Sequence, residues 1–183
     1  MNLITKRVHM NRCNGREVKQ LTLDRDFNVP DARPDALQIM KEQGEVQIEE
    51  VHMMEGKASV KGLLHFQILY ASDGDIPVSE MTGTIPFEET IPLPQAKAED
   101  EISVQAEIGD LKSELINSRK LGMKAIVVLN VTAGSVCDGE GAIDIEGGED
   151  IYTKKRTAEV SYLIFSKKDT LRVRDEWKIP GTK

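Results

Sequence analysis

One long run of alternating side chains most constrains how this chain can fold. Between Lys57 and Ser72, apolar residues and one glycine recur at every second position: Ala58, Val60, Gly62, Leu64, Phe66, Ile68 and Tyr70. A period of two places such side chains on one face of an extended strand. Similar runs cover 21–29, 81–93, 102–108 and 121–131. The pattern predicts a mainly β fold, either an antiparallel β-sandwich or a partly open barrel.

Hairpin turns and one irregularity are expected between these strands. Glu55-Gly56 and Asn117-Ser118 have turn-forming residues and separate runs of alternating character. The apolar positions change parity between Val46-Ile48 and Val51-Met53, which predicts a β-bulge at Glu49-Glu50. We therefore expect two long hairpins, one turning at Glu55-Gly56 and the other at Asn117-Ser118.

A bend with two prolines follows the first alternating run. Its residues are Val29, Pro30, Asp31, Ala32, Arg33, Pro34 and Asp35. Proline biases the preceding residue toward extended conformations, and it suits the first turn of a helix. The spacing of Ala36, Leu37, Ile39 and Met40, with Gly44 as a C-terminal cap, then predicts one short α-helix over about 34–43.

The stretch 78–93 is expected to be an edge strand. Prolines lack a main-chain donor and would interrupt a central ladder, and several lie in or beside this run: Pro77, Pro86, Pro92 and Pro94. Edge strands present unpaired main-chain groups, so a partner or a neighbouring repeat can add a strand there. We expect such a contact along the outward positions Val78, Glu80, Thr82 and Thr84.

The C-terminal part of the chain predicts a repeat. The glycine-rich acidic stretch 136–150 has the composition of a mobile linker between a first domain, 1–135, and a second segment, 151–183. In that segment, Leu171, Val173, Trp177, Ile179 and Pro180 follow the order and spacing of Leu21, Leu23, Phe27, Val29 and Pro30. A constant offset indicates a tandem array. Residues 151–183 are therefore expected to be the lead strands of a second, truncated copy.

Composition narrows the classes of partner and compartment. A formal charge of -7, with no long basic run, disfavours nucleic acid and anionic membrane surfaces as partners. The N-terminus lacks the uninterrupted apolar stretch of a signal peptide, and no segment approaches the roughly 18 apolar residues of a membrane span. Two cysteines, Cys13 and Cys137, make no disulfide framework. A cytoplasmic protein is the simplest expectation.

No catalytic, metal or cofactor site is predicted. His52 and His65 should lie far apart on the first hairpin, so neither they nor His9 are expected to bind a metal with the cysteines. The acidic residues of 138–146 lack the spacing of an EF-hand loop. Asp31 and Asp35 could form an acid–base pair, but their place beside prolines fits turn chemistry better. A small hydrolase would need a pocket with converging carboxylates.

Several motifs together resemble the SPOCS domain, the spore-coat repeat of SipL-type proteins. Its Val-Pro-Asp-x-x-Pro-Asp bend is similar to Val29–Asp35, and its Gly-Lys-x-x-Val-x-Gly-x-Leu hairpin is similar to Gly56–Leu64. Further stretches of the family resemble Ile85–Ile91, Leu115–Lys120 and Lys168–Pro180. The residues that carry the resemblance, as structural motif positions, are Val29, Pro30, Asp31, Pro34, Asp35, Gly56, Gly62 and Asn117.

The resemblance implies a non-enzymatic scaffold module of spore-envelope assembly. Its partners would be proteins of the spore coat, met on the mother-cell side of the forespore surface, and other repeats or copies of itself. SipL-type proteins engage the coat-base ATPase SpoIVA, but through a LysM module for which these residues contain no pattern. The alternative function is a carbohydrate- or peptidoglycan-binding β-sandwich, which an exposed row of aromatic side chains would favour.

Overall fold

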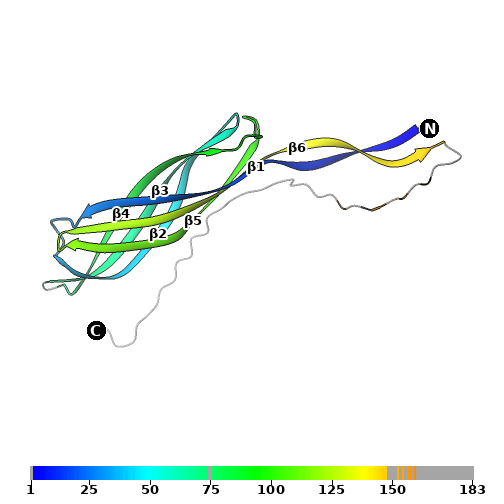
Figure 1. The fold of residues 1–183 in the computed structure, drawn as a ribbon. Coiled ribbons are helices and arrows are strands. Elements are labelled where there is room, and N and C mark those ends of the chain that lie inside the picture. The colour runs from blue at the N-terminus through cyan, green and yellow to red at the C-terminus, as the bar shows by residue number, and fades with distance from the viewer. Residues whose placement is uncertain are drawn as a thin grey trace. The chain divides into compact units, whose positions relative to one another are not determined.

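The computed structural model describes residues 2–73 and 76–147, together with Tyr152, Lys154, Arg156, Thr157 and Glu159. These residues contain six strands and no helix, and hence no helix with the length and apolar character needed to cross a membrane. The strands are β1 (Asn2–Asn28), β2 (Ala36–Met54), β3 (Lys57–Ser72), β4 (Val78–Pro92), β5 (Glu101–Asn117) and β6 (Lys120–Glu146) (Figure 1).

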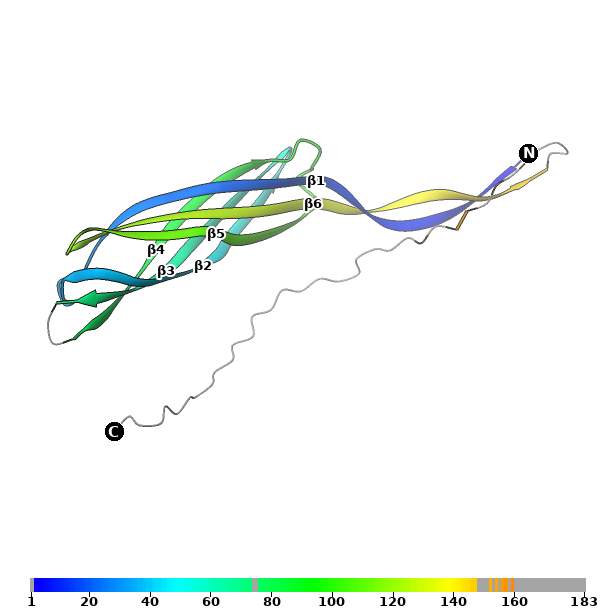
Figure 2. The ribbon, with the colours of Figure 1, turned by 60° about the horizontal axis from the view of Figure 1, so that its bottom comes forward.

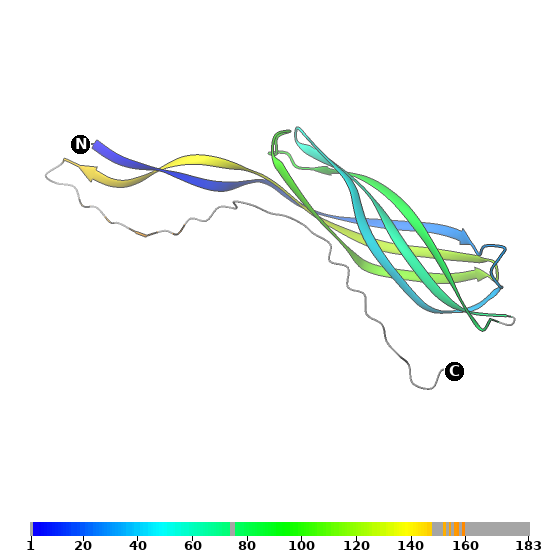
Figure 3. The ribbon, with the colours of Figure 1, turned by 180° about the vertical axis from the view of Figure 1, so that it is seen from behind.

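The strands form two sheets, with the orders β1-β6-β5 and β2-β3-β4. Figure 2 shows them as two layers, and Figure 3 shows β2, β3 and β4 side by side. The ladders β2–β3, β3–β4 and β5–β6 are antiparallel. The chain crosses from one sheet to the other at 29–35 and again at 93–100. The predicted mainly β fold, a sandwich or a partly open barrel, is therefore confirmed, and the two separate sheets make it a sandwich.

The chain divides into two compact units, Asn11–Cys137 and Met1–Met10 with Asp138–Lys183. The first unit holds the sandwich, and the second contains the beginning of β1 and the end of β6. The acidic stretch 136–150, predicted to be a mobile linker, belongs to β6 as far as Glu146. Main-chain pairing with β1 makes a strand of residues that bury little surface.

The sandwich core is made by the alternating side chains that the sequence placed on one parity. All the apolar members of the β3 run are buried, and two adjoining clusters of core residues extend between the sheets. Phe27 of β1 and Phe66 of β3 meet across the sheets, with ring centroids 4.6 Å apart in an edge-to-face arrangement. The period of two was therefore sufficient to identify the inward faces of β1, β3, β4 and β6.

The helix predicted over 34–43 is wrong, because residues from Ala36 onward begin β2. The β2–β3 register shifts between Ala36 and Gln38 and again between Ile39 and Lys41. Two irregularities so close together break the alternation and give a spacing that imitates a helix. Of the four side chains expected on the buried side of this helix, Leu37 and Met40 are 59% and 60% exposed, whereas Ala36 is buried and Ile39 half-buried.

Gly44, expected to cap that helix, instead lies within β2. A Cβ atom there would come within 2.9 Å of Ile108 Cδ1 and 3.0 Å of Leu111 Cδ2, both on β5. The missing side chain thus allows β2 to approach the opposite sheet closely.

The first hairpin agrees with the sequence in its turn, its bulge and its edge. Met54 pairs with Lys57 around Glu55-Gly56, and Gly56 has a φ of 70°, a left-handed conformation that favours glycine. The register shift between Ile48 and Glu50 confirms the predicted bulge. β4 is an edge strand of its sheet, as expected.

Two phenylalanine–glycine pairs join β3 to β4. Gly62 lies opposite Phe87, and Phe66 lies opposite Gly83. A Cβ atom on Gly62 would be 2.5 Å from Phe87 Cζ and 2.6 Å from the carbonyl oxygen of Gln47. A Cβ atom on Gly83 would collide with the Phe66 ring. Each ring therefore covers the glycine on the neighbouring strand, which explains a glycine inside a buried strand.

Candidate functional site

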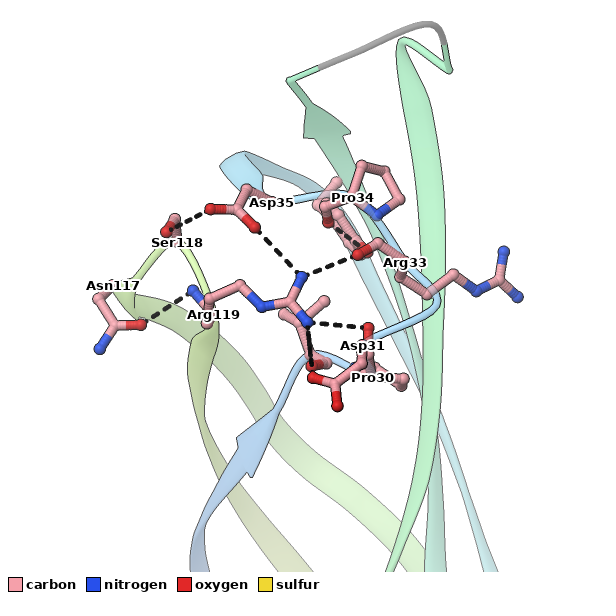
Figure 4. Close-up of polar contacts among 10 residues, drawn as sticks. Pro30, Asp31, Arg33, Pro34, Asp35, Asn117, Ser118 and Arg119 are labelled. Atoms are coloured by element: carbon pink, nitrogen blue, oxygen red, sulfur yellow. Dashed lines mark hydrogen bonds and ion pairs between the residues drawn. The ribbon is translucent and has the colours of Figure 1, made fainter.

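The proline-containing bend 29–35 and the turn between β5 and β6 lie against each other at one end of the sandwich (Figure 4). The side chain of Arg119, from that turn, reaches into the bend. We call Arg119, its neighbours Asn117 and Ser118, and the segment Val29–Asp35 the Arg119 clamp. It joins segments that are far apart in the sequence.

The guanidinium group of Arg119 binds three main-chain carbonyl groups of the bend. Its Nη2 atom donates to the carbonyl oxygens of Val29 and Pro30, both at 3.0 Å, and its Nη1 atom donates to that of Arg33 at 2.8 Å. A planar guanidinium with donors in a fixed fork can serve several acceptors at once, which an ammonium group cannot do in the same geometry. Arg119 therefore fixes the path of the main chain through the bend.

Both aspartates of the bend also accept hydrogen bonds from this arginine. Asp31 Oδ1 lies 3.3 Å from Arg119 Nη2, and Asp35 Oδ1 lies 3.2 Å from Nη1. Asp35 Oδ2 accepts a further hydrogen bond from Ser118 Oγ at 2.9 Å. The two carboxylates thus share one cation, and this arrangement can orient a loop by charge-assisted hydrogen bonds.

Main-chain hydrogen bonds complete the clamp. The N–H of Val29 donates to the carbonyl oxygen of Arg119, and the N–H of Ala36 donates to that of Ser118, both at 2.8 Å. The Asn117 side chain accepts from the N–H of Arg119 at 2.9 Å, which shapes the turn locally.

The remaining motif positions surround this clamp or lie in the first hairpin. The carbonyl oxygen of Pro34 accepts a hydrogen bond from Tyr70 Oη at 3.3 Å, so β3 also holds the bend. The carbonyl oxygen of Gly56 accepts from the N–H of Leu93 at 2.8 Å. The sequence indicated Asn117 but not Arg119. The position of Arg119 in the turn stretch Leu115–Lys120 was the available signal, and nothing in the pattern of residues indicated its contacts.

A second polar cluster holds the other crossover, 93–100. The Asp100 side chain accepts hydrogen bonds from the N–H of Lys97 and from Asn14 Nδ2, each at 2.9 Å, and Asp100 is only 6% exposed. These bonds, that from Lys97 first, hold the pKa of the Asp100 carboxyl below its usual range. Asn14 also donates to Ser135 Oγ at 3.0 Å, which connects the crossover to β1 and β6. No pattern in the sequence indicated this cluster.

The outward positions of β4 lie where the sequence placed them. Val78, Glu80, Thr82 and Thr84 are exposed, and Val78 is 45% exposed. The odd-numbered residues directly before and after β4 form main-chain hydrogen bonds with residues at or beside the ends of β3. The N–H of Leu93 donates to the carbonyl oxygen of Gly56, and the carbonyl oxygen of Pro77 accepts from the N–H of Ser72 at 3.1 Å. The register between these ends is unbroken. The even-numbered residues therefore direct their main-chain groups away from β3.

The histidines and cysteines of the described residues do not converge. His52 pairs with Ser59 and His65 with Glu45, so the expected separation of these histidines along the hairpin is confirmed. His52 Nε2 lies 2.6 Å from Glu50 Oε1, and this contact lowers the pKa of Glu50. Within the described residues no group of three or more potential ligands could hold a metal ion, and Cys13 and Cys137 are free thiols.

Aromatic side chains of the unit Asn11–Cys137 point inward. Phe66, Tyr70 and Phe87 are at most 8% exposed, and Phe27 is half-buried. A shallow depression of about 430 Å³ on the β2-β3-β4 sheet is lined at its surface by polar side chains, among them Glu45, His65 and Thr84. The exposed aromatic row that would favour carbohydrate binding is therefore not seen in this unit.

One comparison with known proteins finds a related family. Residues 35–116 match the model of the family described as SipL, SPOCS domain. No curated protein and no solved structure matches the chain. The match spans β2 to β5, whereas β1, β6 and Arg119 lie outside it, so the sandwich is larger than the matched stretch. The resemblance seen in the sequence is confirmed over this stretch: residues 35–116 are similar to the SipL-type SPOCS domain, a domain of a sporulation-related family.

Proposed function

We propose that this chain is a non-enzymatic interaction module of a scaffold for spore-envelope assembly. It would act through protein–protein contacts in the mother-cell cytoplasm, at the forespore surface, as one repeat of a longer array. The match to the SPOCS domain, which is not a known enzyme family, supports the sporulation context. The observation that carries the interaction role is the free edge of β4.

The accessible part of this edge runs from Val78 to Thr84. Its outward residues have main-chain donors and acceptors that point away from β3, and the first proline of the same parity is Pro86. Beyond that point, Lys19 of β1 reaches across to Glu89 at 3.2 Å. A partner strand would therefore find a ladder without prolines over 78–84 and an obstructed one after it.

The polar residues of the family motif support a scaffold role because they serve the fold. Asp31 and Asp35 bind Arg119, and Asp35 also binds Ser118. In a hydrolase, such carboxylates would face a substrate. Here they hold the crossover between β1 and β2.

The proposal is tested with the full chain, tagged and recovered from sporulating cells of a spore-forming host. Thr84→Pro removes one outward donor, and Glu80→Lys reverses a charge on the edge. Glu114→Lys, an exposed charge reversal on β5, is the matched control. We expect the coat proteins captured by the parent chain to be lost with both edge variants and kept with the control.

Two results would count against this function. Capture that is unchanged by both edge variants would exclude the β4 edge as the contact. Binding of defined peptidoglycan fragments by the parent chain, abolished by neither variant, would favour the carbohydrate-binding alternative. The coat-base ATPase SpoIVA is the first partner to examine among captured proteins, since SipL-type proteins engage it.

A further inference from the structure

One end of the β2-β3-β4 sheet, beside the Arg119 clamp, carries a group of apolar side chains on or next to its outer face. Four of them are between 45% and 60% exposed, and two are half-buried. A contiguous exposed apolar group on a soluble protein marks a surface that binds a partner. We call these residues the apolar patch: Leu37, Met40, Leu69, Ala71, Ile76 and Val78.

Two β-bulges near the start of β2 create much of this patch. Ile39 packs against the core, whereas Lys41, which pairs with Leu69, lies on the outer face. Met40 is the extra residue between them, and Leu37 is the extra residue at the preceding bulge. Bulges re-aim side chains in this way, so the exposure of these two apolar residues is built into the strand.

Two charges of opposite sign flank the centre of the patch. Leu69 of β3 pairs with Lys41 of β2 on one side and with Glu80 of β4 on the other, so the three form one row across the sheet (Figure 3). Lys41 is exposed and forms no ion pair with any residue that the structure describes. Glu80 accepts a hydrogen bond from Gln67 Nε2 at 2.9 Å, which holds its carboxylate on this face. The row thus has a positive end, an apolar centre and a negative end.

This row is complementary to a reversed copy of itself. If a second copy places the same face against the first, with a two-fold axis parallel to β3, Leu69 meets its counterpart and each Lys41 meets Glu80 of the other copy. The bulged side of β2, with Met40, then lies over the β4 side of the other copy, with Val78. A two-fold axis across the strands would instead set Lys41 against Lys41 and Glu80 against Glu80, and like charges repel. The charges therefore select one arrangement.

We propose that the apolar patch binds the apolar patch of a second copy of this chain, and that the two copies form a two-fold dimer with their β3 strands parallel. A standard interface takes roughly 20–30 residues from each partner. The patch and its charged rim are smaller, so the dimer belongs to the weak, reversible class. The contact uses side chains of the outer face and not the main-chain groups of the β4 edge, so the inference does not depend on the proposed function.

Sedimentation velocity of the full chain over a range of concentrations tests this dimer. The parent chain should pass from monomer to dimer in the micromolar range. Met40→Asp places a charge inside the patch and should raise the dissociation constant about tenfold or more. Val18→Asp is the matched control, because Val18 is 55% exposed on β1, in the other sheet. Circular dichroism checks that all three chains have the same β content.

Two charge reversals test the orientation of the copies. Lys41→Glu and Glu80→Lys should each weaken association, because each sets like charges opposite one another in a dimer of identical chains. An equimolar mixture of the two variants should associate as the parent chain does, since every facing pair in the mixed dimer then joins opposite charges.

A parent chain that stays monomeric up to millimolar concentration would overturn the proposal, as would a dimer that Met40→Asp leaves intact. Failure of the two charge-reversal variants to associate when mixed would overturn the arrangement with parallel β3 strands. If the parent chain were monomeric and Met40→Asp abolished capture of coat proteins, the patch would belong to a partner protein instead. The Thr84→Pro variant of the β4 edge changes a residue outside the patch, so the two contacts can fail separately.

Discussion

Val29 and Arg119 bind each other in both directions. The N–H of Val29 donates to the carbonyl oxygen of Arg119 at 2.8 Å, and Arg119 Nη2 donates to the carbonyl oxygen of Val29 at 3.0 Å. Val29 is buried and directly follows β1, while Arg119 stands in the turn directly before β6. This reciprocal contact fixes where the chain leaves one sheet for the other.

Replacing Arg119 should therefore destabilise the sandwich more than its position in a turn suggests. We expect Arg119→Ala to lower the free energy of unfolding by about 1–3 kcal/mol, the range for losing hydrogen bonds to charged donors at a partly exposed site. Arg119→Lys should recover only part of this lost stability, because an ammonium group lacks the planar pair of donors that reaches the carbonyl oxygens of both Val29 and Arg33. Urea unfolding followed by circular dichroism measures this difference.

Arg33 supplies the matched control in the same bend. Its side chain only approaches Glu80, at 3.9 Å, so Arg33→Ala should change stability by less than about 0.5 kcal/mol. If Arg33→Ala and Arg119→Ala lowered the free energy of unfolding equally, the Arg119 clamp would contribute no more to stability than an ordinary surface charge.

Gly62 should not tolerate even one additional carbon atom. A methyl group there would meet both the Phe87 ring and the carbonyl oxygen of Gln47, and the latter is main chain that cannot rotate away. We expect Gly62→Ala to cost about 1–3 kcal/mol by overpacking. Gly122→Ala is the control, since the nearest atom, at 3.2 Å, belongs to the flexible side chain of Glu114. Thermal unfolding that shows the same midpoint for both variants would contradict the role given to Phe87.

The alternation of apolar residues was enough to predict a mainly β fold, a sandwich or a partly open barrel, because most strands have one buried face. In β3 this period runs without interruption from Ala58 to Tyr70, so the sequence alone indicates which side chains face the core. In β2 the alternation fails as a guide to structure. Its register shifts near Ala36 and Ile39 produce a spacing that residues alone cannot distinguish from a helix. Only pairing with β3 decides between the two.

The clamp was predictable in part. The prolines and aspartates of the bend were visible as turn-forming residues, and their family resemblance marked them as a unit. The partner of those aspartates was not visible, because Arg119 follows Asp31 by many residues and contacts mainly carbonyl groups, which every residue has. Asp100 was missed for the same reason, since one of its donors is the main-chain N–H of Lys97.

Asp100 should make the sandwich sensitive to acid. Its pKa is lowered in the folded chain, so its contribution to stability is complete above the unfolded value of about 3.8 and is lost as pH falls through the folded pKa. We expect the parent chain to lose more unfolding free energy between neutral pH and about pH 3 than Asp100→Asn does. Urea titrations at each pH measure this. Asp24→Asn, an exposed control, should keep the parental pH dependence, and an unchanged slope for Asp100→Asn would refute the prediction.

Proline substitutions along β4 should alternate in their effect on stability, because successive main-chain N–H groups point to opposite sides of the strand. Thr84 has the parity of Pro86, so Thr84→Pro removes a donor that faces away from β3, and we expect it to cost less than about 1 kcal/mol. Glu89 has the opposite parity, and Glu89→Pro should remove a ladder hydrogen bond to β3 and leave a carbonyl group unpaired, at a cost of about 1–3 kcal/mol.

Glu89→Ala separates this ladder effect from loss of the ion pair with Lys19, which by itself should cost at most about 1 kcal/mol. The free energy of unfolding in urea is the measurement for all three variants. Equal destabilisation by Thr84→Pro and Glu89→Pro would mean that both donors lie in ladders, and the edge from Val78 to Thr84 would then have no outward row of main-chain groups for a partner strand to bind.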